Sequence, residues 1–159
     1  MTDTAFTTCL WFDTEAEAAA QYYTAIFKNS ALGRVSCWPD AGPGDPGTVI
    51  TVEFELNGQK FVGLNGGPQF TFTEAISFQI PCTDQDEVDY YWSSLTEGGA
   101  ESNCGWLKDR YGLSWQVIPT VLIDMITDPD QRKAKRATAA MLSMSKLDIA
   151  ALRRAYNGE

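Results

Sequence analysis

The sequence predicts an α+β protein of paired β-α-β-β-β modules, which form curved, mainly antiparallel sheets, with a C-terminal helical tail. Three observations support this prediction. Segments of β-forming residues alternate with amphipathic helical segments, the order of one strand, one helix and three strands occurs twice, and helical periodicity dominates the last part of the chain. We expect a single domain over residues 1–159, with modules at about 5–66 and 74–118 and a tail at 119–159.

The first module begins with a strand and a helix. Thr7–Phe12 is rich in β-forming residues, and Asp13 or Thr14 is the predicted cap of the helix that follows. Apolar residues in this helix recur at the spacing of one buried face, so the helix is expected to pack on a sheet. These apolar residues are Ala19, Tyr22, Tyr23, Ile26 and Phe27.

Three strands complete the first module. We expect a strand at Leu32–Trp38, followed by an irregular loop because proline and glycine fill the next segment. Thr48–Leu56 alternates between polar and apolar residues, as a half-buried strand does. The dipeptide Asn57-Gly58 is typical of a two-residue hairpin turn, and Gln59–Asn65 is the expected partner strand after it.

The second module repeats this order. Ala75–Ile80 is predicted as a strand that ends at Pro81, and Thr83 or Asp84 is the expected cap of the next helix. Helical spacing again gives this helix one apolar face, which predicts that it packs on a second sheet. The residues of that face are Val88, Tyr91, Trp92 and Leu95.

Two short strands, at about 100–108 and 113–118, complete the second module. The tail that begins at Thr120 has the periodicity of helices, and Pro129 separates the first of them from the next. Four basic residues lie at helical spacing in this tail, and we interpret them as a solvated helix face. They are Arg132, Lys133, Lys135 and Arg136.

Composition excludes several classes of partner. The net charge of −9 argues against nucleic acid and anionic membranes, because both require a basic surface. No segment approaches the ~18 apolar residues of a membrane span. Met1–Thr8 has no basic start followed by an apolar run, so we expect a cytoplasmic protein without a signal peptide.

The residue types available for chemistry are limited. Histidine is absent, which removes the commonest zinc ligand and the base of Ser–His or Cys–His nucleophiles. The 4 cysteines form no C-x-x-C pair, and we expect them as buried, reduced thiols. Any catalysis would therefore depend on carboxylates, tyrosines, lysines or cysteines.

Gln116 is an amide in a predicted strand of apolar residues. Without hydrogen-bond partners a buried amide costs about 1–3 kcal/mol, so Gln116 needs them. Three interpretations stay open: hydrogen bonds between strands, contact with a small ligand, and the remnant of a metal site. Cys9 shares a strand face with Thr7, and Ser77 shares one with Gln79. Trp11 and Trp115 are predicted to lie in the core.

Four segments resemble the PhnB-like branch of the vicinal oxygen chelate superfamily, which includes glyoxalase I and the bleomycin-resistance proteins. The resemblance implies the glyoxalase/bleomycin-resistance fold and a homodimer. Members of this branch often carry the label 3-demethylubiquinone-9 3-methyltransferase. The segments are LWFDTEAEAAAQYYTAIF (10–27), LNGGPQFTFTEAISFQI (64–80), WLKDRYGLSWQVIP (106–119) and ITDPDQRKAKRATAAMLSMSKLDIAALRRAY (126–156).

The resemblance also implies where a metal would bind. Catalytic members of the superfamily hold a divalent metal with four side chains, usually His, Glu or Gln, one from each of four strands. These positions fall at about Thr7, at Asn65, at Ala75 or Ser77 depending on the register, and at Gln116. Neutral oxygens cannot neutralise a divalent ion, so we expect no metal and no cofactor.

Together these observations favour a protein that binds a small organic molecule in a metal-free cleft, with no commitment on catalysis and the ligand unknown. The alternatives are a methyltransferase, a metal-dependent lyase or dioxygenase of the same superfamily, and a protein–protein module. No glycine-rich loop follows the first strand, as S-adenosylmethionine enzymes of the usual α/β type require, because no glycine precedes Gly33. The candidate ligand-binding residues are Thr7, Cys9, Asn65, Ser77, Gln79 and Gln116.

Overall fold

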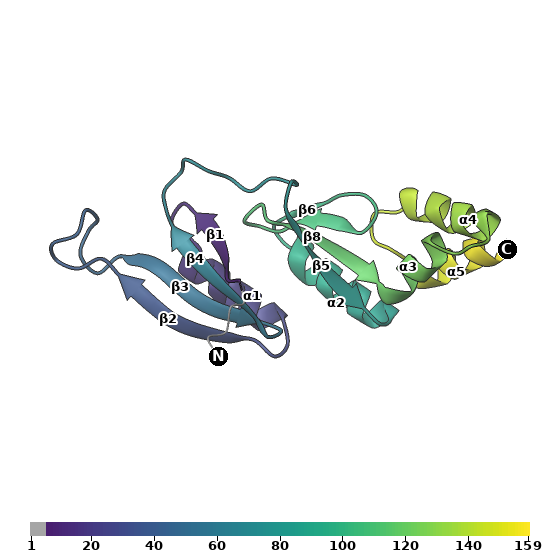
Figure 1. Ribbon diagram of the computed structural model, residues 1–159. Coiled ribbons are helices and arrows are strands. Elements are labelled where there is room, and N and C mark those ends of the chain that lie inside the picture. Colours follow the sequence, from purple (N-terminus) through teal and green to yellow (C-terminus); the bar gives the residue numbers. More distant parts are fainter. Residues whose placement is uncertain (1–5) are drawn as a thin grey trace. The chain divides into compact units, whose positions relative to one another are not determined.

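A computed structural model describes residues 6–159 (Figure 1). The chain divides between Thr71 and Phe72 into two compact units, and each unit contains one four-stranded sheet. The predicted α+β class, with two β-α-β-β-β modules and a helical tail, is therefore confirmed. In the described part of the chain, no helix combines the length and apolar character needed to cross a membrane.

The first unit contains one mixed sheet with strand order β1-β4-β3-β2. Strands β1 and β4 run parallel, whereas the other two neighbouring pairs run antiparallel. The sheet is therefore mainly antiparallel, as predicted. Its elements are β1 (Thr8–Phe12), α1 (Ala16–Ile26), β2 (Ala31–Cys37), β3 (Val49–Leu56) and β4 (Gln59–Asn65).

Helix α1 packs closely on the first sheet because small residues face it. A Cβ atom on Gly63 would lie 3.1 Å from the Cβ atom of Ala16, so glycine permits the contact between β4 and the helix. Tyr23 is fully buried and stacks on Phe54 with ring centroids 6.2 Å apart. Phe54 in turn stacks on Phe61 at 5.3 Å. These contacts form the core of the first unit.

The start of α1 differs from the prediction, whereas the hairpin agrees with it. Neither Asp13 nor Thr14 caps the helix, and the N-cap residue Glu15 makes no capping hydrogen bond with its side chain. The backbone N–H of Ala16 instead donates to Oδ1 of Asn65, at 2.9 Å. The Asn57-Gly58 turn has φ values of 48° and 82°, as a type I′ hairpin requires.

The second unit contains a sheet with strand order β5-β8-β7-β6. The predicted first strand is shifted by two residues, because β5 starts at Ser77 and continues through Pro81. Pro81 is tolerated because β5 is an edge strand and needs no hydrogen-bond donor on its outer side. The elements are β5 (Ser77–Cys82), α2 (Gln85–Thr96), β6 (Ala100–Glu101), β7 (Trp106–Lys108) and β8 (Ser114–Pro119).

Helix α2 begins with a reciprocal capping arrangement. The side chain of Asp84 accepts a hydrogen bond from the backbone N–H of Glu87 at 2.9 Å. Oε2 of Glu87 accepts one from the backbone N–H of Thr83 at 2.7 Å. Both predicted cap residues therefore contribute to the helix start. The buried face of α2 consists of Val88, Trp92 and Leu95.

The tail folds as three helices of the second unit, α3 (Thr120–Ile126), α4 (Gln131–Leu142) and α5 (Ile149–Asn157). The Gln85 side chain of α2 joins the tail to the rest of the unit, because it donates to the carbonyl of Leu147 at 3.2 Å and accepts from the backbone N–H of Ile149 at 2.9 Å. The helices enclose a small core of Leu122, Met125, Ala137, Leu147 and Leu152.

Candidate functional site

Each sheet has one face against its helix. Most of the predicted site residues lie on the opposite face, whereas Asn65 pairs with Phe12 on the α1 side. In the first sheet, Leu10 and Phe12 of β1 are buried on the α1 side. The alternate side chains of the same strands therefore project from the opposite face. The pairing register places Cys9, Val62 and Glu53 in one row across β1, β4 and β3 on that face.

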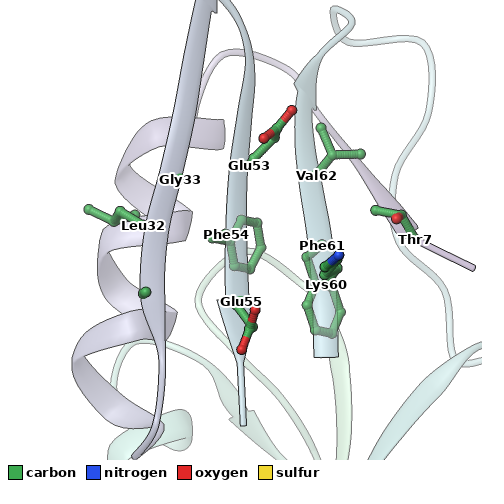
Figure 2. A pocket seen from close by; sticks show the side chains of 10 residues that line it. Thr7, Leu32, Gly33, Glu53, Phe54, Glu55, Lys60, Phe61 and Val62 are labelled. Atoms are coloured by element: carbon green, nitrogen blue, oxygen red, sulfur yellow. The ribbon is translucent and has the colours of Figure 1, made fainter. Parts of the chain in front are cut away.

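A cavity of about 520 Å³ lies on the first sheet (Figure 2). Figure 2 shows side chains of both charges from β3 and β4 around it. Nη2 of Arg34 lies 2.7 Å from Oε1 of Glu53, so one of the carboxylates has a cationic partner. Thr7 is one of the residues that line this cavity. Other lining residues are Gly33, Glu53, Glu55, Lys60 and Val62.

Cys9 and Trp11 lie on the same face of β1 and differ in how far their side chains are exposed. The predicted burial is wrong for Cys9 and Cys37, which are both exposed. Partial desolvation nevertheless raises the pKa of the Cys9 thiol, which disfavours the reactive thiolate at neutral pH. Trp11 is half-buried and lies on the same strand face as Cys9, so the core position predicted for it is wrong. Its Nε1 donates to the carbonyl of Gly67 at 2.9 Å, and its ring contacts Phe70 edge-on.

Asn65 is held within the first unit by backbone groups at both ends of its amide. Oδ1 accepts the N–H of Ala16 at 2.9 Å, and Nδ2 donates to the carbonyl of Val49 at 3.1 Å. The amide therefore joins β4 to the start of α1 and to β3. This arrangement gives Asn65 a structural role.

The second sheet carries two rows of side chains on the face opposite α2. Trp115 and Val117 are buried on the α2 side, which confirms the predicted core position of Trp115. The alternate residues of β5, β8 and β7 therefore share the other face. The register aligns Gln79, Gln116 and Trp106 in one row and Ser77, Ser114 and Lys108 in the next.

Among the residues that the structure describes, the side-chain amide of Gln116 bonds to two side chains of the neighbouring strand β5. Its Oε1 accepts a hydrogen bond from Nε2 of Gln79 at 3.3 Å, and its Nε2 donates to Oγ of Ser77 at 2.8 Å. The structure thus brings together three of the predicted site residues. Hydrogen bonding between strands is the interpretation of Gln116 that these contacts favour. All three side chains are at least partly exposed.

Other residues at this face were not predicted as site residues, among them Ser114, Lys108 and its partner Glu74. Ser114 is fully buried, and among the residues that the structure describes its Oγ has no hydrogen-bond partner. Nζ of Lys108 lies 2.6 Å from Oε1 of Glu74, and this contact lowers the pKa of the Glu74 carboxyl. Ser114 could have been identified from the sequence, because it alternates with Gln116 in β8 and therefore shares its strand face. The contact between Glu74 and Lys108 could not, because it depends on the order of the strands in the sheet.

The donors at the four superfamily positions do not fit a divalent metal. At the third position Ala75 has no donor atom, and the alternative Ser77 offers only a neutral hydroxyl group that already accepts a hydrogen bond from Gln116. The amides of Asn65 and Gln116 likewise have hydrogen-bond partners. Within residues 6–159, no three His, Cys, Asp or Glu side chains are grouped so that they could hold a metal ion. Neutral oxygens alone cannot offset a divalent charge.

Comparison with solved structures supports the same fold. The PhnB protein from Bacillus cereus is 36% identical, with a TM-score of 0.67, covering 74% of this chain and 100% of that chain. Protein PA1353 from Pseudomonas aeruginosa shares 14% identity and a TM-score of 0.62, covering 74% and 98%. The fosfomycin resistance protein FosX from Listeria monocytogenes shares 13% identity and a TM-score of 0.52, covering 78% and 98%. The last two similarities concern the fold alone.

Comparison with protein families gives a more specific result. No curated protein matches the chain. The model of the 3-demethylubiquinone-9 3-methyltransferase family matches residues 4–118, which span both sheets and leave the helices of the tail outside. The chain therefore belongs to this family, and the resemblance to PhnB proteins noted in its sequence is confirmed.

Proposed function

We propose that the protein binds a small organic molecule on the face of the second sheet opposite α2, without a metal. Ser77, Gln79 and Gln116 are the polar contacts in this proposal. The observation that carries it is the chain of hydrogen bonds from Gln79 to Gln116 to Ser77, which uses no backbone group. These side chains can therefore turn toward a ligand without breaking the sheet, and each amide offers both a donor and an acceptor.

The residues around this chain favour a planar ligand with a carbonyl group. Trp106 lies in the same row as Gln116 and is half-buried, so it offers an aromatic surface beside the amide. Thr7 and Cys9 stay proposed ligand contacts of the first unit itself, where Thr7 lines a cavity of about 520 Å³ that is large enough for a small molecule. Asn65 is the weakest candidate, since backbone groups occupy its amide.

A thermal-shift screen of planar amides and carbonyl compounds tests the proposal. At least one compound should raise the melting temperature of the wild-type protein and not that of Gln116→Leu. Gln131→Leu is the matched control, because Gln131 is an exposed residue at the start of α4. Failure of every compound to stabilise the wild-type protein contradicts ligand binding. Equal stabilisation of Gln116→Leu contradicts this location for the site.

The family name raises methyl transfer as a second function, and we infer that this chain does not bind S-adenosylmethionine. Strand β1 is joined to α1 by Asp13–Glu15, which contains no glycine to approach a cofactor. Usual cofactor-binding folds place a glycine-rich turn at this point. Isothermal titration with S-adenosylmethionine should give no binding heat, and micromolar affinity would reverse the inference.

We also propose a cytoplasmic homodimer. Strand β2 is an edge strand with exposed apolar residues, because Leu32 is 51% exposed and Val35 is 45% exposed. Such an edge is suited to pairing with a second copy of the chain. The four free cysteines are compatible with a reducing compartment. Analytical ultracentrifugation should give the wild-type protein twice the mass of one chain. Val35→Lys should lower this mass toward that of one chain, because the added charge disfavours pairing of the edge strands. A monomeric wild-type protein contradicts the proposal.

A further inference from the structure

We propose that Lys108 and Ser114 form a carboxylate-binding end of the ligand site on the second sheet. The carboxylate of Glu74 occupies this end until the carboxylate of a ligand replaces it. The inference rests on the proposed function and narrows its ligand to a small aromatic carboxylic acid.

The ion pair between Glu74 and Lys108 reaches across a strand. Nζ of Lys108 lies 2.6 Å from Oε1 of Glu74. Glu74 precedes β5, whereas Lys108 ends β7, and β8 lies between these two strands. Because neighbouring strands are about 4.8 Å apart, the pair joins elements separated by roughly 10 Å. The residue of β8 at this level is Ser114, which pairs with both Ser77 and Lys108.

The side chain of Ser114 independently indicates that a hydrogen-bonding partner is missing at this end of the site. Its side chain is 0% exposed, and within the described part of the chain no group bonds to its Oγ. Buried hydroxyl groups are normally hydrogen-bonded, because an unpaired one loses its contacts with water without replacement. A carboxylate has two oxygens, so a ligand held by Lys108 could also accept the O–H of Ser114.

Glu74 has the properties of a replaceable occupant. Its side chain is 62% exposed, and that of Lys108 is 39% exposed. Exposed ion pairs contribute little to stability, so a carboxylate with additional contacts can displace this one. Hydrogen bonding to Lys108 lowers the pKa of Glu74, which keeps the internal carboxylate charged at neutral pH.

The neighbouring side chains favour an aromatic acid. Trp106 lies two residues before Lys108 on the same face of β7 and pairs with Gln116 in β8. A ring that extends from the carboxylate can therefore contact the indole of Trp106. The amides of Gln79 and Gln116 lie in the same row as that indole and can bind a polar substituent.

Titration with sodium benzoate and with benzamide, its neutral counterpart, tests the inference. Calorimetry is carried out at ionic strength matched with sodium chloride. Glu74→Gln should raise the affinity for benzoate about two- to fivefold, because it removes the competing charge. Lys108→Met should lower it about tenfold or more, and Ser114→Ala several-fold, since charge-assisted hydrogen bonds are lost. The affinity for benzamide should change less than about twofold.

Glu97→Gln and Lys135→Met are matched controls, because they make the same charge changes at exposed positions of the second unit. Thermal unfolding verifies that each variant is folded. A benzoate affinity that Lys108→Met leaves unchanged, or that Glu74→Gln lowers, overturns the carboxylate site. Benzamide binding that Gln116→Leu abolishes would then still support the proposed function. If neither probe binds the wild-type protein or Glu74→Gln, both proposals fail.

Discussion

The two units each place an amide in a strand that pairs in parallel with the first strand of its sheet, and they use it differently. Within residues 6–159, the side-chain amide of Asn65 in β4 bonds to backbone groups, the N–H of Ala16 and the carbonyl of Val49. The side-chain amide of Gln116 in β8 bonds instead to the side chains of Gln79 and Ser77. Backbone partners are fixed by the fold, whereas side-chain partners can rotate. The amide of Gln116 is therefore the one that can exchange its partners for a ligand.

The same contrast applies to the turns that join the last two strands of each unit. The first turn is the exposed Asn57-Gly58 hairpin. The second is organised by Asp109, a buried carboxylate that accepts hydrogen bonds from Tyr111 N, Leu113 N and Trp115 Nε1. In the second unit, strand β8 thus follows a turn with more fixed contacts.

The largest predicted effect follows from this difference. Asp109→Ala leaves three donors without their acceptor and should reduce the free energy of unfolding by about 3 kcal/mol. Asn57→Ala, at a positive φ in an exposed turn, should reduce it by about 1 kcal/mol. Urea denaturation monitored by circular dichroism measures both values. Equal losses would show that the two turns do not differ as described.

The amides themselves give the next largest effect. Asn65→Ala removes two hydrogen bonds to the backbone and should cost about 2 kcal/mol, because both partners are left unpaired. Gln116→Ala removes bonds between side chains that water can replace, and should cost less than about 1 kcal/mol. The same urea experiment compares them. A larger loss for Gln116→Ala would reverse the structural and ligand-binding roles assigned here.

Cysteine reactivity gives a further comparison between the two units. Burial raises the pKa of the Cys82 thiol to about 12, whereas Cys37 is exposed. At pH 8 a thiol reagent should modify Cys37 in the native protein and Cys82 only after unfolding. The folded-state pKa lies above the unfolded one, so the stabilisation from a neutral Cys82 should disappear as the pH rises from about 9 to about 12. Rapid modification of native Cys82 contradicts this expectation.

Local sequence patterns predicted the elements well, and contacts between distant segments explain the differences. Period-two alternation in Thr48–Leu56 identified the two faces of β3 correctly. The cap of α1 could not be predicted, because Asn65 supplies it from 49 residues away. Alternation with Leu10 and Phe12 predicts a core position for Trp11, but these two neighbours occupy the α1 side, and Trp11 lies on the other face, where it bonds to the loop at Gly67. A Cβ atom on Gly66 would lie 2.2 Å from the Trp11 ring, so this loop depends on glycine.

Only part of the candidate site could be predicted from the sequence, because its contacts also join distant segments. Alternation placed Ser77 and Gln79 on one face, and the family resemblance identified Gln116. Their contact depends on the parallel pairing of β5 with β8, which joins residues 37 and 39 positions apart. The pairing of Lys108 with Glu74 additionally requires the strand order β5-β8-β7. Neither register nor strand order can be read from local periodicity.

Nuclear magnetic resonance of the side-chain amides tests the central claim most directly. On titration with benzamide, the ¹H–¹⁵N signals of Gln116 and Gln79 should shift in a saturable manner, while those of Asn65 stay in place. Assignment of each signal comes from the spectra of Gln116→Leu, Gln79→Leu and Asn65→Ala. Saturable shifts at Asn65 with none at Gln116 would contradict the claim that the second sheet carries the ligand site.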